Sequence, residues 1–288
     1  MTGFQVKENL RQGRCVVGTH ILSLMNPTSA ALTAEMAMDF AFICTEHIPL
    51  GRTEVGMMCQ YYAAKGTSPI VRVPSPDAVS IATMLDGGAE GIVVPYVETV
   101  EEVRRIVGAV KYRPIKGEML RAWMEEGVAL PEATARYLET FNRDKYVIIG
   151  VESVPAIERL DELLAVPGVD AVFLGPHDIT TSMGIPTEYT HPRFVAAVES
   201  IIRRCRARSI GVGLHFQLLR LPGDVLERYL AAGMNWLINA ADVIIMREAM
   251  NAQFGQLRHL AQRHLPGAIA SPASKPPLES CLTSGGPA

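Results

Sequence analysis

The stretch YVIIGVESVPAIERLDELLAVPGVDAVFLGP (residues 146–176) carries the pattern on which the fold prediction rests. Two runs rich in β-branched and other apolar residues, 146–153 and 170–176, flank a segment in which Ile157, Leu160 and Leu164 recur at helical spacing. Both runs are almost continuously apolar, which is typical of parallel strands that are covered by helices. The stretch therefore predicts a strand, a helix and a second strand parallel to the first.

The same alternation continues on both sides of this stretch. Further apolar runs lie at residues 15–22, 40–46, 68–73, 91–97, 211–216 and 236–242. Eight strands in order, with helices between them, predict a single TIM-type (β/α)8 barrel in residues 1–264. An open doubly wound sheet is the alternative. Against it, no GxGxxG motif follows the first strand, and the eight predicted strands equal the number in a closed barrel, so no strand remains unassigned.

Composition and charge narrow the class of function. The 288 residues include 27 basic and 30 acidic side chains, a net charge of −3, with no long run of one sign. This balance argues against a nucleic-acid partner or an anionic membrane surface and favours a small-molecule substrate. The five cysteines are scattered without a CxxC motif, and no apolar run approaches the roughly 18 residues of a membrane span. We therefore expect a cytoplasmic protein without a signal peptide or a membrane helix.

Two segments stand outside the repeating pattern. The connection from Pro114 to about Asp144 is too long for a plain unit of the barrel, and we expect an irregular segment that serves as an active-site lid or a subunit contact. Residues 265–288 are rich in Pro, Ser, Gly and Ala with few large apolar residues, which predicts a disordered tail.

Polar side chains follow several of the predicted strands at the point where each strand ends. In a barrel enzyme the carboxyl ends of the strands carry the chemistry, so these positions are the candidate site. They are Glu46 and His47 after the second strand, Arg72 in the third, Glu152 in the fifth, and Gly175, Pro176, His177 and Asp178 after the sixth. A salt bridge or a helix cap can explain any one of them, Asp178 in particular, but not their convergence.

The residue types at these positions fit metal-assisted enolate chemistry. Carboxylates on neighbouring strands, Glu152 and Asp178, can hold Mg²⁺ or Mn²⁺ and leave positions for a 2-oxo acid that binds through two oxygens. Arg72 can stabilise the enolate oxygen, and His47 can move a proton at neutral pH. Asp86 can orient that imidazole, although for this residue taken alone a turn before the following glycines is the favoured explanation.

Longer motifs add a family resemblance. TEHIP (45–49), VRVP (71–74), MLDGGAEGIVVPYVETVEE (84–102) and VESVPAIERLDELLAVPGVDAVFLGPHDITTSMGIP (151–186) resemble the metal-dependent, class II pyruvate aldolases of the HpcH/HpaI type. That family includes 4-hydroxy-2-oxoheptanedioate and 2-keto-3-deoxyglucarate aldolases. The resemblance covers about residues 13 to 260 and implies a barrel of the phosphoenolpyruvate/pyruvate-binding type.

The resemblance also implies roles for the candidate residues. Glu152 and Asp178 become the ligands of Mg²⁺, with Mn²⁺ or Co²⁺ as alternatives, and His47 and Asp86 become an acid/base dyad. Arg72 stabilises the pyruvate enolate. The segment Gly175, Pro176 and His177 binds substrate, with backbone amides near His177 and Asp178 receiving its carboxylate.

The resemblance further implies a homo-oligomer, a hexamer or trimer of dimers, in which the C-terminal helix packs across subunits. Here that helix is expected over about Val243 to His264, and its apolar residues suit a partner face. The alternative is an ordinary eighth barrel helix that packs on its own subunit.

The chain departs from the family pattern around the metal and the long connection. Gly150 stands where the family usually has glutamine, His177 replaces a small residue, and Thr19-His20 replaces an aromatic after the first strand. The family's YPPxGxRG loop reads YRPIKGEMLRAW here. The leading expectation is a lyase that cleaves a 4-hydroxy-2-oxo acid to pyruvate and an aldehyde, or condenses them.

Four alternative functions remain open. A decarboxylase of a 2-oxo diacid such as oxaloacetate, or a natural-product enzyme that forms carbon–carbon bonds, would use the same enolate. An acyl-CoA lyase and a non-catalytic binding barrel fit the motifs less well.

Overall fold

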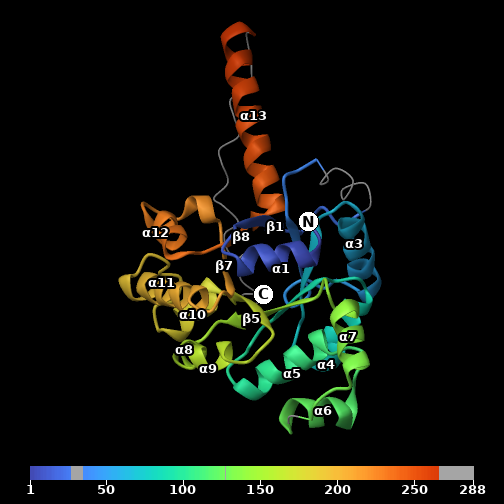
Figure 1. Cartoon of the computed structure of the whole chain (residues 1–288). Coiled ribbons are helices and arrows are strands. Elements are labelled where there is room, and N and C mark those ends of the chain that lie inside the picture. The colour runs from blue at the N-terminus through green and yellow to red at the C-terminus, as the bar shows by residue number, and fades with distance from the viewer. Residues whose placement is uncertain (27–34, 127, 266–288) are drawn as a thin grey trace.

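In a computed structural model of the chain, which describes residues 1–26, 35–126 and 128–265, eight parallel strands close into a barrel (Figure 1). The strands are β1 (Val16–His20), β2 (Phe40–Cys44), β3 (Ser68–Arg72), β4 (Gly91–Val94), β5 (Tyr146–Val151), β6 (Val169–Leu174), β7 (Gly211–His215) and β8 (Trp236–Ala241). Each pairs with its sequence neighbour, and β1 pairs with β8. The expected TIM-type barrel is confirmed, and each strand lies in or within one residue of its predicted run.

Helices surround the strands (Figure 1). They are α1 (Gly3–Arg11), α3 (Arg52–Ala64), α4 (Ala78–Asp86), α5 (Val100–Lys111), α6 (Gly117–Glu125), α7 (Glu132–Phe141), α8 (Val154–Glu158), α9 (Leu160–Leu164), α10 (Pro176–Ser182), α11 (Pro192–Arg206), α12 (Val225–Ala232) and α13 (Asp242–His264), with a 3₁₀ turn η1 (Leu218–Arg220). The larger apolar cluster, between strands and helices, explains why both faces of the strands are apolar.

The barrel interior forms a second apolar cluster that α1 closes at the amino end of the strands. Val6 and Leu10 of α1 are fully buried in that cluster, together with Phe40, Tyr146 and Trp236. With this end plugged, the opposite end, where the strands finish, is the one that can admit a substrate.

Helix starts at that open end are fixed by local capping. Ser153 caps α8, accepting a hydrogen bond from the Ala156 amide at 3.3 Å, so the polypeptide turns sharply after Glu152. Thr99 and Glu102 form a capping box at the start of α5. These caps hold the residues that follow β4 and β5 at the barrel mouth.

The long connection between α5 and β5 differs from its prediction. It contains two helices, α6 and α7, rather than an irregular segment. Because it joins the end of a barrel helix to the start of a strand, it lies at the amino end of the strands, away from the mouth of its own barrel. A lid over its own site is therefore excluded, and the role as a subunit contact remains a prediction.

The C-terminal helix α13 projects away from the barrel (Figure 1). Its first turn is anchored by the buried residues Asp242 and Ile244, whereas nearly all of its residues from 247 onward are exposed. The alternative of an ordinary eighth helix packed on its own barrel is therefore wrong. The predicted tail, 265–288, lies outside the described residues apart from Leu265, and no described helix is long and apolar enough to cross a membrane.

Candidate active site

Arg72, the last residue of β3, is held rigidly at the mouth of the barrel. Its side chain is 6% exposed, and Nε lies 3.0 Å from Oε2 of Glu46. Nε and Nη2 also donate to the Cys44 sulfur at 3.3 and 3.1 Å. The guanidinium carbon lies 5.7 and 5.4 Å from the ring centroids of Phe42 and Phe173. These contacts fix a positive charge in one orientation inside a largely apolar wall.

Glu46 and His47 follow β2 and lie beside this arginine. The His47 Nε2 atom is 3.5 Å from Oε2 of Glu46, and the imidazole is 41% exposed. Burial lowers the pKa of His47 and the Arg72 charge lowers it further, against opposing effects of Glu46 and Asp178. The neutral imidazole, which can accept a proton, is therefore the favoured form near pH 7.

Glu152 and Asp178 converge on one point above the ends of β5 and β6. A Cβ atom built on Gly175 would lie 2.9 Å from both Oε1 of Glu152 and Oδ2 of Asp178, so both oxygens face the same stretch of backbone. Glu152 is 8% exposed, whereas Asp178 opens to solvent. Glycine at 175 leaves this space free, and two such carboxylates suit a hard divalent cation that completes its coordination with water or substrate.

The electrostatics of the site also favour a cation. Burial raises the pKa of Glu152 to about 7, Arg72 opposes the rise, and the neighbouring carboxylates of Asp178 and Glu46 add to it. Glu46 and Glu152 thus share one guanidinium, Asp178 adds a third carboxylate beside Glu152, and a divalent ion would relieve the excess negative charge. In the described part of the chain, no three His, Cys, Asp or Glu side chains gather as a metal-binding group, so the fit rests on the Glu152–Asp178 pair.

Tyr96, after β4, is a site residue that the sequence reasoning missed. Its backbone amide donates to Oε2 of Glu152 at 3.3 Å, and its φ of 58° is unusual for a tyrosine. A hydrogen bond to Glu46 and partial burial raise the pKa of the Tyr96 phenol to about 12. Tyr96 thus links the two buried carboxylates. The only signal in the sequence for Tyr96 is its position, two residues after the last residue of β4.

Two histidines lie in the upper layer of the barrel, below Arg72. The rings of His20 (β1) and His215 (β7) are 5.1 Å apart in an edge-on arrangement, and both contact Phe42. His20 is 5% exposed, and neither ring nitrogen has a hydrogen-bond partner among the described residues. Burial lowers the pKa of His20 to about 3, with smaller effects of Arg72 and His47, so His20 is neutral. His215 was not singled out from the sequence.

Asp86 is the one predicted catalytic residue that the structure does not bring to this end of its own barrel. It is the last residue of α4, which runs back toward the amino end of the strands, and its exposed carboxylate pairs with Arg113. Within one chain Asp86 therefore does not reach His47. A His47–Asp86 dyad would require a second copy of the chain.

The remaining predicted residues lie where the sequence placed them. Gly175 is the N-cap of α10, Pro176 opens the helix, and His177 and Asp178 follow in its first turn, so Asp178 is not the helix cap. Gly150 also has a steric reason to be glycine. A Cβ there would lie 3.0 Å from the Val94 carbonyl oxygen and 3.3 Å from the Glu152 carboxyl carbon.

Comparison with known proteins agrees with this geometry. The sequence model described as HpcH/HpaI aldolase/citrate lyase matches residues 21–249. The chain belongs to this family. The predicted resemblance and the expectation of a carbon–carbon lyase of the aldolase type are thereby confirmed, and aldolases of this class generally depend on a divalent metal.

Relatives cover nearly the whole chain. The 2-keto-3-deoxy-L-rhamnonate aldolase of Escherichia coli O17:K52:H18 is 30% identical over 261 residues, 88% of this chain and 92% of the relative. An HpcH/HpaI aldolase from Desulfitobacterium hafniense has a similar structure, with a TM-score of 0.74, 26% identity and coverage of 92% and 99% of the two chains. Macrophomate synthase matches with a TM-score of 0.71, 26% identity and 92% coverage of each chain.

Proposed function

We propose that the protein is an aldolase that uses a divalent metal, Mg²⁺ in the first place, to cleave a 4-hydroxy-2-oxo acid into pyruvate and an aldehyde, and to catalyse the reverse condensation. The observation that carries this proposal is the convergence of Glu152 and Asp178 beside the immobilised Arg72. The relatives named 2-keto-3-deoxy-L-rhamnonate aldolase support a 2-oxo acid as the substrate class.

Glu152 and Asp178 would hold the metal, with Mn²⁺ or Co²⁺ as substitutes for Mg²⁺. When bound there, such an ion supplies positive charge beside the oxygens of a 2-oxo acid and stabilises negative charge that develops on them. Tyr96 keeps the Glu152 carboxylate oriented through its backbone amide. Gly175, Pro176 and His177 would line the position of the substrate carboxylate at the start of α10.

Arg72 would stabilise the enolate. When the bond between C3 and C4 breaks, its electron pair moves toward C2 and leaves negative charge on the C2 oxygen. Arg72 Nη1 lies 4.0 Å from Glu152 Oε1, so the guanidinium borders the proposed metal position on the side of Glu46 and Phe42. The Arg72 guanidinium does not have to reorient during the reaction, because its ion pair with Glu46 and its contacts with the Cys44 sulfur already hold the side chain in place.

His47 would accept the proton of the C4 hydroxyl. Loss of that proton turns the C4 oxygen into the carbonyl of the departing aldehyde as the C3–C4 bond breaks, and C3 is then protonated to give pyruvate. Neutral imidazole is the form required for the first step, and the lowered pKa of His47 favours it near pH 7. Its exposure leaves room for a substrate hydroxyl.

Natural-product carbon–carbon bond formation is a second candidate, which the similarity to macrophomate synthase favours. It would use the same enolate with a different electrophile. Decarboxylation of an oxaloacetate-like 2-oxo diacid would likewise need the metal and Arg72, but no base for a C4 hydroxyl.

We further propose that the chain acts as a cytoplasmic homo-oligomer, a hexamer or trimer of dimers. A row of α13 residues, Met246, Met250, Phe254 and Leu257, is between 41% and 62% exposed at helical spacing and suits a face against another copy. Association would also allow Asp86 of one copy to approach His47 of another.

Proton exchange at C3 of pyruvate tests the central proposal. The full-length protein with Mg²⁺ and pyruvate in D₂O should incorporate deuterium into the methyl group, because exchange passes through the enolate and needs no aldehyde. Incubation with oxaloacetate and with a panel of aldehydes then distinguishes decarboxylation from aldol chemistry. Glu152→Gln should abolish exchange, whereas Glu162→Gln, an exposed carboxylate on α9, should not. Absence of exchange in the parent protein would refute the proposal.

A further inference from the structure

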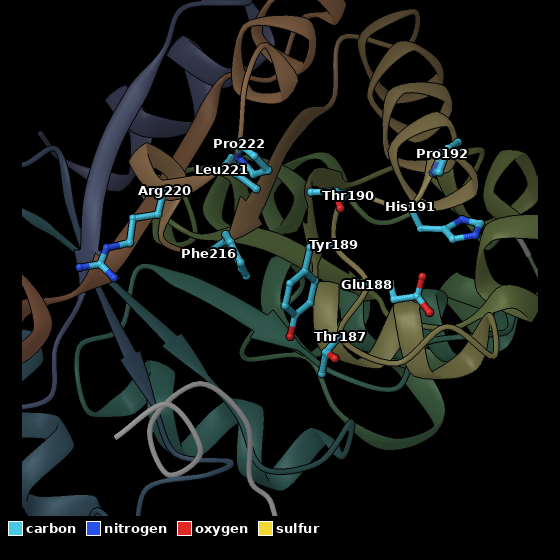
Figure 2. Close-up of a pocket in the computed structure, with 10 residues that line it drawn as sticks. All are labelled: Thr187, Glu188, Tyr189, Thr190, His191, Pro192, Phe216, Arg220, Leu221 and Pro222. Atoms are coloured by element: carbon cyan, nitrogen blue, oxygen red, sulfur yellow. The ribbon is translucent and has the colours of Figure 1, made fainter. Parts of the chain in front are cut away.

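A cavity of about 450 Å³ lies at the rim of the barrel mouth, between the connection that follows α10 and the connection that follows β7 (Figure 2). Its walls include Tyr189 and Thr190 on one side and Phe216, Leu221 and Pro222 on the other. Since β6 and β7 are parallel, both connections leave the same end of the barrel as the catalytic residues. The cavity is therefore on the face that admits substrate.

Contacts tie the cavity to the candidate active site. The Thr187 amide donates a hydrogen bond to Oγ1 of Thr180 at 3.3 Å. This bond joins the side of the cavity that contains Tyr189 and Thr190 to α10, the helix that carries Asp178. Burial raises the pKa of the Tyr189 phenol, and the charge of Asp178 adds to the rise. On the other wall, Phe216 directly follows His215, whose ring contacts Phe173 in the upper layer of the barrel. The cavity therefore lies beside α10, the helix that carries Asp178.

The walls are aromatic and mutually fixed. Tyr189 and Phe216 lie next to each other (Figure 2), with ring centroids 4.8 Å apart. Tyr189 also meets Phe194 edge-on, with ring centroids 6.4 Å apart. Arg220 extends away from these rings and pairs with Glu248 of α13, so its charge is already matched. Glu188 and His191 also line the cavity, on the side of Tyr189 and Thr190. The part formed by Tyr189, Phe216 and Leu221 is accordingly the one suited to an uncharged aromatic or branched apolar group.

From this arrangement we infer that the cavity binds the side chain of the aldehyde partner and selects aldehydes with an aromatic or bulky apolar substituent. The inference rests on the proposed aldol function, because the aldehyde reacts with the pyruvate enolate at the adjoining site. A volume of about 450 Å³ is within the range that holds drug-sized molecules and exceeds the need of a two-carbon aldehyde. Tyr189 and Phe216 would stack on the ring, and the aldehyde carbon would point toward His47.

The test compares benzaldehyde with acetaldehyde as partners of pyruvate, using the full-length protein with Mg²⁺. The parent should have a kcat/KM for benzaldehyde at least ~10-fold above that for acetaldehyde, the scale of a buried aromatic contact. Phe216→Ala should lower the benzaldehyde value ~10-fold, and Thr190→Trp, which fills the cavity, should lower it further. Both variants should keep the acetaldehyde value and the deuterium exchange of pyruvate. Leu219→Ala, in the same connection but 83% exposed, is the matched control and should change nothing.

Binding of benzaldehyde, measured by ligand-observed NMR, keeps the test separate from catalysis. Binding to the parent that Thr190→Trp abolishes would support the cavity even if pyruvate exchange failed, in which case only the aldol function would fall. Equal use of both aldehydes by the parent, or a parallel loss of both in Phe216→Ala, would overturn the inference. So would binding of benzaldehyde that Thr190→Trp leaves intact.

Discussion

Arg72 and Glu46 form a buried ion pair, in which the side chains are 6% and 7% exposed and Nε lies 3.0 Å from Oε2. A pair this deeply buried is poor at adding stability, because desolvation of both ions offsets their attraction. Its effect here is to orient a guanidinium toward the ends of β5 and β6. Arg72 is the last residue of β3, and Glu46 follows the neighbouring strand β2, whose register sets Cys44 opposite Arg72.

Replacement of Arg72 should abolish every reaction that passes through the enolate. We expect Arg72→Ala to reduce both aldol cleavage and pyruvate C3 exchange by ~10²-fold or more, the usual scale for the loss of one group that stabilises an oxyanion. It should also lower the melting temperature, because Glu46 is left buried without its partner. Arg104→Ala, a 49% exposed arginine on α5, is the control for stability and activity. Retention of exchange in Arg72→Ala would exclude the enolate role.

Replacement of His47 should separate the two reactions. His47→Ala removes the base for the C4 hydroxyl, so aldol cleavage should fall ~10²-fold or more, whereas decarboxylation of oxaloacetate should change little. Stability should be nearly unaffected, since the imidazole is 41% exposed. His259→Ala on the exposed part of α13 serves as the matched control. If His47→Ala impaired both reactions equally, together with the melting temperature, His47 would have a structural role instead.

Removal of the metal should abolish turnover, and Mg²⁺, Mn²⁺ or Co²⁺ should restore it. A second readout needs no catalysis: adding Mg²⁺ to the stripped protein should raise its melting temperature, because the ion binds only the folded Glu152–Asp178 pair. Glu152→Gln should lose this rise, and the exposed Glu162→Gln should keep it. Full activity after exhaustive chelation would point instead to a lysine Schiff base.

The barrel was predictable from the sequence because parallel strands buried on both faces produce apolar runs that stand out from amphipathic helices. The ends of those runs also placed Arg72, Glu152 and Asp178 near one another. The aromatic walls were not predictable, because Tyr189 and Phe216 lie in irregular connections whose path depends on tertiary contacts. Asp86 shows another limit: its motif indicated chemistry, but only the direction of α4 reveals that it faces away from its own site.

Replacement of His20 should alter how stability depends on pH. The unfolded chain protonates this histidine near pH 6.5, whereas the folded protein keeps it neutral to about pH 3. The contribution of the buried neutral His20 to the free energy of unfolding is therefore complete above pH 6.5 and is lost as pH falls toward 3. Between these two pH values the free energy of unfolding falls with a slope that approaches about 1.4 kcal/mol per pH unit. His20→Leu should remove this slope. Chemical unfolding of parent and variant at pH 7.5 and 5.5 measures it, and identical pH dependence would show that His20 is not buried as a neutral ring.

The last prediction concerns Asp86, which lies at the end of α4 and pairs with Arg113 far from His47 of the same chain. If Asp86 assists His47, it does so from another subunit, and each active site draws on two chains. Light scattering at micromolar concentration should then give an oligomeric mass, and Leu257→Lys on the exposed face of α13 should lower it. A monomeric parent would exclude a shared site.

Subunit mixing tests the sharing directly. Asp86→Asn and Glu152→Gln should each be inactive alone, yet mixed subunits should regain about a quarter of the parent activity, because a random arrangement reunites both intact residues at that fraction of sites. Mixing Glu152→Gln with Asp178→Asn is the control. Those two residues belong to one site in one chain, so this mixture restores little. If the Asp86→Asn mixture behaved like the control, or Asp86→Asn alone were fully active, Asp86 would be a surface residue whose partner is Arg113 alone.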